Sequence, residues 1–302
     1  MPASHGRDEL LSARLERFTR MLHGIERGKA SAIHRTRVAT RRLREVLPVL
    51  QLEGVAARKI GHALRRVTRQ LGVIREIDVL LAVTDEFRKA RRYPARALGV
   101  VAADIRRERE GALDEFDGKV VAAEIKNVAR KLERVAADLG RSDGRRLRGR
   151  AWRWAIDARA ARRAADLKAA IDRAGAMYLP ERLHAVRIGV KKLRYGVELG
   201  AETSGAGRRA ELGALKRAQD VLGRLHDLQV LLDRVRRVQA SPDPPDLATR
   251  RELDTLVVAL EHACRRLHAR YMRQRDTLSA ICARLIVRSA RQPRQAAIRR
   301  AS

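Results

Sequence analysis

Two segments of the sequence combine histidine with arginine or lysine at the same spacing and contain no acidic residue. Residues 34–44 read HRTRVATRRLR, and residues 184–194 read HAVRIGVKKLR. Guanidinium groups make bidentate contacts to phosphate, and lysine acts as a point charge. Histidine donates to a phosphate oxygen and can gain a proton when an anion arrives. These residue types in this pattern favour binding of a phosphate-rich anion.

On a helix with 100° per residue, each segment places its cations on one stripe and its apolar side chains on another face. The stripes are His34, Arg37, Arg41 and Arg44 in the first segment, and His184, Arg187, Lys191 and Arg194 in the second. Like charges three or four positions apart cost about 0.2–0.5 kcal/mol per pair, so a bound anion would relieve both stripes. A solvated helix face is the alternative, but histidine recurring in register adds nothing to such a face.

A second motif follows each segment, in the same order and at nearly the same separation. Residues 71–81 read LGVIREIDVLL, and residues 222–232 read LGRLHDLQVLL. The repetition predicts two similar helical halves, related by a pseudo-twofold axis. The carboxylates Glu76, Asp78 and Asp227 could hold Mg²⁺ in a phosphatase. Pairing with Arg75, Arg224 or neighbouring cations is the favoured interpretation.

Helices must position these motifs, because apolar residues recur at helical spacing along the whole chain and strand-like alternation is nearly absent. We expect about ten helices of roughly 15–25 residues. The predicted breaks are Gly28, Gly54, Gly72, Tyr93-Pro94, Gly118 and the stretches 140–149, 175–180, 204–207 and 241–246. Residues 1–150 and 151–285 form the two predicted halves, and residues 286–302 a basic, disordered tail.

The composition points to a polyanionic partner. The 302 residues include 67 Lys+Arg against 36 Asp+Glu, a net charge of +31 that is spread over both halves. No apolar run is long enough for a membrane span, no signal peptide is present, and two cysteines cannot form a disulfide framework. We therefore expect a cytoplasmic protein that does not contact membranes.

The paired HxxR[VI]xx[RK][RK]LR segments, with the downstream LG motifs, resemble the CHAD domain family over about residues 8–285. The resemblance implies an all-α fold of two four-helix-bundle-like halves around a basic groove or pore, where long-chain inorganic polyphosphate binds. Many members of the family carry a triphosphate-tunnel (CYTH) domain, but the sequence contains no such segment with its Glu-rich strands, so we expect a standalone binding domain. Its expected role is recruitment to polyphosphate granules or phosphate homeostasis.

The predicted ligand-binding residues are those of the two segments and three basic residues near the second motifs. They are His34, Arg37, Arg41, Arg42, Arg44, Arg65, Arg69, His184, Arg187, Lys191, Lys192, Arg194, Tyr195 and Lys216. The Arg-Asp pair of the family is Arg75-Glu76 in one copy and His226-Asp227 in the other, and this departure weakens any role for the carboxylates.

Two other functions stay open. A nucleic-acid-binding architectural protein is the alternative, because so basic a surface binds DNA at low salt; an aromatic content of 3% argues against base stacking. An enzyme acting on phosphoanhydrides is less favoured, since Asp78 is matched by Gln229 and no phosphate-binding glycine loop occurs. His262, Cys264 and His268 do not share one helix face, so we expect neither metal nor cofactor.

Overall fold

The computed structural model describes residues 6–50, 55–142, 148–204, 207–241 and 245–301, with the backbone alone at 55–56, 142, 148–151, 153, 204 and 290–301. The predicted all-α fold is confirmed, because the described residues contain helices and no strand. The helices are α1 (Arg7–Thr19), α2 (Leu22–Glu26), α3 (Ala30–Val46), the 3₁₀ turn η1 (Leu47–Val49), α4 (Val55–Lys89), α5 (Ala95–Asp114), α6 (Gly118–Ser142), α7 (Arg148–Ala174), α8 (Pro180–Ser204), α9 (Arg209–Gln239) and α10 (Leu247–Ala301).

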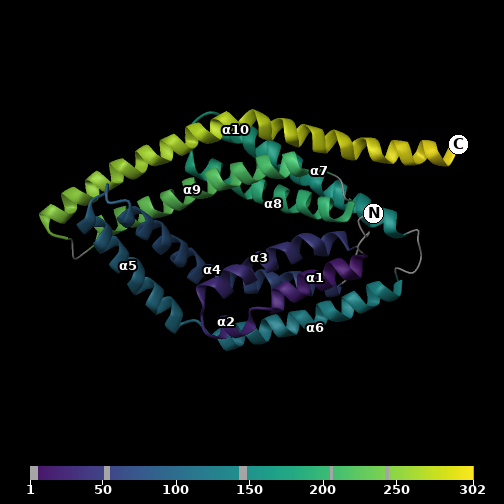
Figure 1. The fold of residues 1–302 in the computed structure, drawn as a ribbon, viewed down its shortest axis with the longest axis horizontal. Helices are drawn as coiled ribbons and strands as arrows, with labels where there is room; N and C mark the ends of the chain where they lie inside the picture. The colour runs from purple at the N-terminus through teal and green to yellow at the C-terminus, as the bar shows by residue number, and fades with distance from the viewer. Residues whose placement is uncertain (1–5, 51–54, 143–147, 205–206, 242–244, 302) are drawn as a thin grey trace.

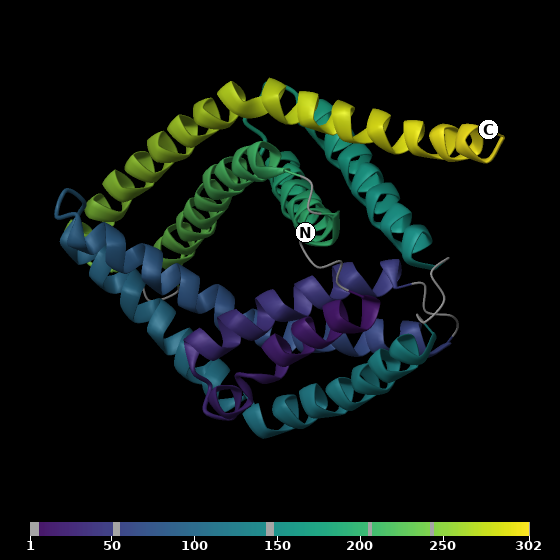
Figure 2. The same ribbon diagram turned by 45° about the vertical axis from the view of Figure 1, so that its right-hand side comes forward.

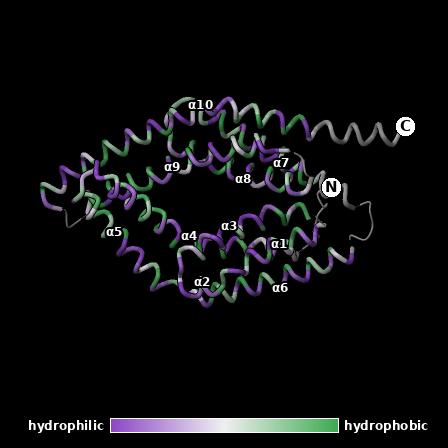
Figure 3. The backbone as a smooth tube through the Cα atoms, in the orientation of Figure 1, coloured by the Kyte–Doolittle hydropathy of each residue, from purple (hydrophilic) through white to green (hydrophobic). Residues whose placement is uncertain are grey.

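Short polar contacts fix where several helices begin. The Asp117 carboxylate accepts a hydrogen bond from the Val120 amide at 2.9 Å at the start of α6. Asp246 does the same for the Thr249 amide at 3.0 Å at the start of α10. Such caps satisfy amide groups that lack a partner within the helix. Hydrophilic and hydrophobic residues alternate along the helices, as expected for amphipathic helices with one buried face (Figure 3).

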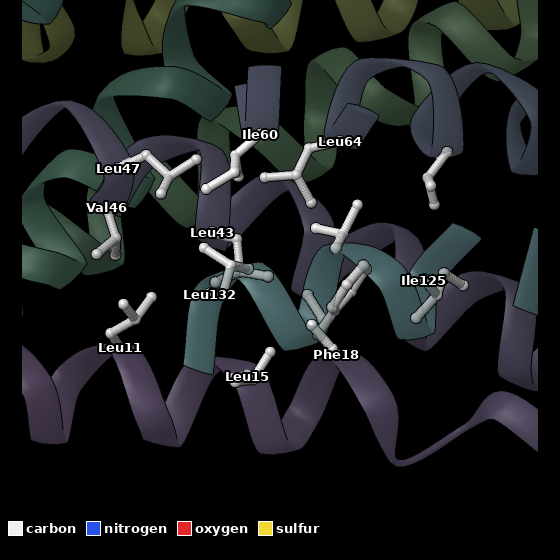
Figure 4. Packing of buried hydrophobic residues seen from close by; sticks show 14 of the residues in the cluster. Leu11, Leu15, Phe18, Leu43, Val46, Leu47, Ile60, Leu64, Ile125 and Leu132 are labelled. Carbon is white, nitrogen blue, oxygen red and sulfur yellow. The ribbon is translucent and has the colours of Figure 1, made fainter. Parts of the chain in front are cut away.

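The helices pack around three hydrophobic clusters. In the first, α1, α3, α6 and the beginning of α4 surround side chains such as Leu11, Phe18, Leu43 and Leu64 (Figure 4). In the second, α7, α8, α9 and α10 pack together. The two groups of helices lie on opposite sides of the molecule, with α4 in the first and α9 in the second (Figures 1 and 2).

The third cluster joins segments that are far apart in the sequence. Ile77 and Leu80 of α4 and Val101 of α5 pack with Leu231 of α9 and Leu256 of α10. Each of the long helices α4 and α9 therefore contributes to two clusters, and the predicted halves share a core. The limits of those halves at residues 150 and 285, and their pseudo-twofold relation, stay predictions.

Two local predictions differ from the structure. Gly72 does not end a helix but lies inside α4, where a β-carbon would meet Nη1 of Arg37 at 2.7 Å. The glycine makes room for that guanidinium. The helix α10 continues to Ala301, through most of the segment predicted as a disordered tail, and its Leu285 is buried and Ile286 packs on the second cluster.

Gly118 tests how closely α2 and α6 approach each other. A β-carbon there would lie 2.6 Å from the carbonyl oxygen of Ile25 and 2.8 Å from that of Glu26, so backbone would have to move. We expect Gly118→Ala to lower the free energy of unfolding by about 1–3 kcal/mol. The control is Gly111→Ala on α5, where nothing lies within 4 Å of the new β-carbon.

Alanine at position 111 should raise the unfolding free energy by roughly 0.5–1 kcal/mol, because it favours the helix. Urea denaturation followed by circular dichroism measures both changes. Equal effects of the two substitutions would contradict the close packing of α2 against α6.

Candidate polyanion-binding site

A cavity of about 1590 Å³ lies between α3, α4, α8 and α9, and α7 and η1 add to its wall. Its lining includes thirteen arginine and lysine side chains but four aspartate and glutamate side chains, so the surface is strongly positive. A wall this basic attracts anions and raises their local concentration.

Most of the residues predicted to bind ligand line this cavity. They are His34, Arg37, Arg41, Arg44, Arg65, His184, Arg187, Lys191, Lys192, Arg194 and Tyr195. The other three do not: Arg42 lies 3.7 Å from Glu198, and Arg69 and Lys216 are exposed outside the lining. The two stripes 150 residues apart therefore meet across one space, as α3 and α8 face each other.

Seven further basic or imidazole side chains line the cavity and were not among the predicted residues. They are Arg58, His62, Arg75, Arg159, Arg163, Arg224 and His226. Arg75 and His226 occupy the same position in the two downstream motifs. Arg58 and His62, with Arg65, repeat at helical spacing on α4, a pattern that could have indicated a basic face. Nothing in the sequence singles out Arg159 and Arg163 on α7.

Arg37 is both a structural residue and a part of the wall. Its side chain is buried, and its Nη1 donates to the carbonyl oxygen of Thr68 at 3.0 Å. Its Nη2 lies 3.6 Å from the Glu76 carboxylate. This guanidinium ties α3 to α4, so a substitution at Arg37 would change stability as well as anion binding.

Several acidic residues near the cavity are paired with arginines. Glu45 contacts Arg159 at 2.9 Å and Arg163 at 3.3 Å. Arg224 reaches Glu86 at 2.6 Å. The expected pairing of the downstream carboxylates is found with different partners, because Asp78 binds Arg109 of α5 at 2.8 Å and not Arg75.

Several lining cations form no ion pair among the described residues, although the charge of Asp227 favours protonated Arg187. They are Arg41, Arg44, Arg65, Arg75, Arg187, Lys191 and Lys192. They come from α3, α4 and α8, so three helices aim uncompensated positive charge at one space. This arrangement is unfavourable until an anion occupies the cavity.

Burial and the neighbouring cations lower the pKa values of Lys191 and His34 in the cavity wall. Burial, together with Arg41, Arg187 and Arg37, lowers the pKa of Lys191 to about 7. Burial and then Arg75, Arg41 and Arg37 lower the pKa of His34. At neutral pH the amine of Lys191 is therefore only partly protonated.

The histidines of α8 and α9 lie side by side. Nδ1 of His184 is 3.3 Å from Nδ1 of His226. Burial and the nearby Arg187 lower the pKa of both rings, that of His226 to about 4. Next to them, burial raises the pKa of Asp227. In the described part of the chain, no group of three His, Cys, Asp or Glu side chains could hold a metal ion.

Comparisons with known proteins identify relatives in sequence and in fold. The sequence model of the CHAD domain family matches residues 9–236, more than half of the chain. A crystal structure of the CHAD domain from the plant Ricinus communis matches with a TM-score of 0.56 and 23% identity, covering 94% of this chain and 93% of that one. A search of curated protein sequences finds no match. None of the described helices is both long and apolar enough to cross a membrane.

Lys191 should cost stability in the empty protein. Its folded-state pKa of about 7 lies below the ordinary 10.5, so the unfolded chain binds more protons between these values. Stability should therefore rise with pH through this interval. We expect Lys191→Met to raise the unfolding free energy at pH 7 by about 1–2 kcal/mol, a gain limited because solvent screens the cavity wall.

The difference between Lys191→Met and wild type should shrink as pH approaches 10.5, because the lysine becomes neutral in both states only above this value. Urea denaturation of the two proteins across this pH range measures it. A difference that stays constant with pH would mean that methionine merely packs better, and that the Lys191 amine is not titrating near 7.

Proposed function

The chain belongs to the CHAD domain family, and from its cation-lined cavity we propose that it binds long-chain inorganic polyphosphate there without turning it over. The observation that carries this proposal is the convergence of uncompensated cations from α3, α4 and α8 on one space. The proposed role is recruitment to polyphosphate granules in the cytoplasm, or phosphate storage.

The size and lining of the cavity support a linear polyanion. Pockets for single small molecules occupy about 300–1,000 Å³, and this cavity is larger at about 1590 Å³. Its cations lie on several helices along the wall, so they can neutralise successive phosphates of one chain. Release of condensed counterions then supplies much of the affinity, which should fall steeply with added salt.

Nucleic acid is the alternative ligand, favoured by the net charge of +31. Tyr195 is the one Phe, Trp or Tyr ring among the described lining residues of this cavity, and it is buried. Single-stranded nucleic acids are held largely by stacking of bases on aromatic side chains. Polyphosphate needs no such platform, so the lining favours it.

Hydrolysis is disfavoured by the state of the carboxylates. Metal-assisted phosphoryl transfer requires acidic side chains that hold Mg²⁺ beside the phosphates. Here Glu45 is bound by Arg159 and Arg163, and Asp78 is bound by Arg109. The lining carboxylates Asp220 and Asp227 belong to no group of three metal-ligating side chains in the described structure. Long-chain polyphosphate incubated with the protein and Mg²⁺ should release no orthophosphate; steady release abolished by Asp78→Ala would identify an enzyme.

The double substitution Arg41→Gln/Arg187→Gln tests the cavity directly, because both residues line it and no ion pair involves either of them in the described structure. At about 150 mM salt, we expect the affinity for long-chain polyphosphate to fall by about tenfold or more. The slope of log affinity against log salt should decrease by roughly one to two. Calorimetric titration measures both.

The matched control is Arg130→Gln/Arg134→Gln, which removes the same charge from exposed positions on α6 outside the cavity. Its affinity should stay within about threefold of wild type, because salt screens distant exposed charges. Equal losses in the two variants would show that net charge binds the polymer, with no special part for the cavity.

Binding should also depend on pH. A bound polyanion favours the protonated forms of Lys191, His34 and His184, whose pKa values are lowered in the empty cavity. The groups around them are Arg37 and Arg41 of α3, Arg75 and Glu76 of α4, Arg187 of α8, and His226 and Asp227 of α9. Affinity should rise by roughly tenfold from about pH 8.5 to about pH 6, since binding takes up protons.

The variant Lys191→Met separates the contribution of the lysine to the pH dependence of binding from that of His34 and His184. It should flatten the change in affinity above pH 7, where Lys191 titrates in the empty protein, and leave the rise at lower pH that comes from the histidines. Equal wild-type affinity at pH 6 and pH 8.5 would exclude these side chains as phosphate contacts.

A further inference from the structure

A second cavity of about 590 Å³ lies beside the first, between the end of α4, α9 and α10. Arg224 lines both cavities, and it pairs with Glu86, the one acidic residue among the described lining of the smaller one. Four more arginines line the smaller cavity: Arg92, Arg266, Arg270 and Arg273. None of these four has an acidic partner in the described structure. The smaller cavity is therefore lined by an excess of positive charge as well.

The arginines of α10 form a third basic stripe. Arg266, Arg270 and Arg273 follow one another at intervals of four and three residues, so they lie on one face of the helix. All three are exposed. The sequence shows no match between this stripe and the two repeated segments, and the stripe belongs to a different cavity.

The floor of this cavity differs from the wall of the larger one because it is aromatic and aliphatic. The rings of Phe87 and Tyr93 have centroids 4.4 Å apart, and Leu228 and Leu267 continue the apolar surface. Two guanidinium groups lie against the rings: Arg224 at 5.6 Å from the centroid of Phe87, and Arg92 at 5.2 Å from that of Tyr93.

A tight turn between α4 and α5 brings the second ring into place. Arg91 has a φ of 51°, in the left-handed region that residues with a side chain adopt at a cost. The turn directs the chain back so that Tyr93 packs on Phe87, which is 5% exposed at the end of α4. The contact between Tyr93 and Phe87 thus follows a turn with an unusual backbone conformation at Arg91.

Bare polyphosphate has no group that would use this floor. A ligand that matches it carries a flat ring at one end and several negative charges at the other. The volume lies in the range of small-molecule pockets, about 300–1,000 Å³. We propose that the smaller cavity binds a nucleoside phosphate, with the base against the half-buried ring of Tyr93 and the phosphates against Arg266, Arg270 and Arg273. This inference does not rest on polyphosphate binding by the larger cavity.

The first test compares ATP with tripolyphosphate by calorimetry in the absence of divalent ions. Both ligands carry three linked phosphates, but only ATP has a ring. Stacking of a base on an aromatic side chain contributes about 1–3 kcal/mol, so we expect ATP to bind roughly tenfold more tightly. Equal affinities, or no binding of ATP, would overturn the proposal.

Variants then locate the binding. Arg270→Ala/Arg273→Ala should weaken ATP binding by about tenfold or more, because charge-assisted contacts to phosphate are lost. The control is Arg251→Ala/Arg284→Ala, which removes the same charge from exposed positions on the same helix outside both cavities, and should leave ATP binding nearly unchanged. Tyr93→Leu should remove the preference for ATP over tripolyphosphate and keep the affinity for the latter.

The larger cavity is the competing location for ATP. If Arg41→Gln/Arg187→Gln abolishes ATP binding and Arg270→Ala/Arg273→Ala does not, the nucleotide uses the larger cavity and the inference is wrong. Titrating the α10 double variant with long-chain polyphosphate keeps the two proposals apart, since it should bind the polymer as wild type does. Equal loss of ATP binding in the α10 variant and its control would likewise overturn the inference.

Discussion

Electrostatic repulsion around the central cavity is the constraint on which the rest of this structure depends. Arg41 of α3 and Arg187 and Lys191 of α8 face the same space, and burial together with the two guanidinium groups lowers the pKa of Lys191 to about 7. Without other forces, α3 and α8 would move apart. The hydrophobic clusters on either side oppose that movement, because each stripe helix buries its apolar face against neighbours away from the cavity. The third cluster then joins α4 and α5 to α9 and α10 and closes the wall.

Ion pairs reinforce the frame and leave the cavity charged. Arg234 of α9 binds Asp104 of α5 at 2.8 Å, and Arg109 binds Asp78 at 2.8 Å. Within the wall, Glu45 neutralises the arginines of α7, and Glu76 lies beside Arg37. These acidic residues form ion pairs that hold helices together. The lining cations of α3, α4 and α8 named above form no ion pair in the described structure and remain available to a ligand. The stability lost at such positions is the usual consequence of a functional site.

Much of this arrangement could be predicted from the sequence, because the basic and the apolar residues each recur at helical spacing. The stripes of 34–44 and 184–194 are spaced for one helix face, and their recurrence indicated that they act together. Contacts between distant segments could not be predicted in the same way. Arg159 and Arg163 look like an ordinary solvated face, and only the packing of α7 beside η1 brings them to the cavity.

The same limit applies to two individual residues. Gly72 was expected to break a helix, since glycine favours turns, but its lack of a side chain serves the close approach of Arg37. The sequence predicts that Asp78 pairs with Arg75, Arg224 or neighbouring cations, yet Arg109 reaches it from the next helix at 2.8 Å. In each case the partner lies more than 30 positions away, where spacing along one helix carries no information.

We propose that the cavity selects a linear polyphosphate chain over other polyanions. Competition at about 150 mM salt tests it most directly, with labelled long-chain polyphosphate displaced by duplex DNA, RNA or unlabelled polyphosphate at matched phosphate concentration. We expect unlabelled polyphosphate to displace the label at far lower phosphate concentration than either nucleic acid. Displacement by DNA or RNA at equal or lower concentration would contradict the account, because it would mean that the +31 charge binds polyanions without selection by the cavity.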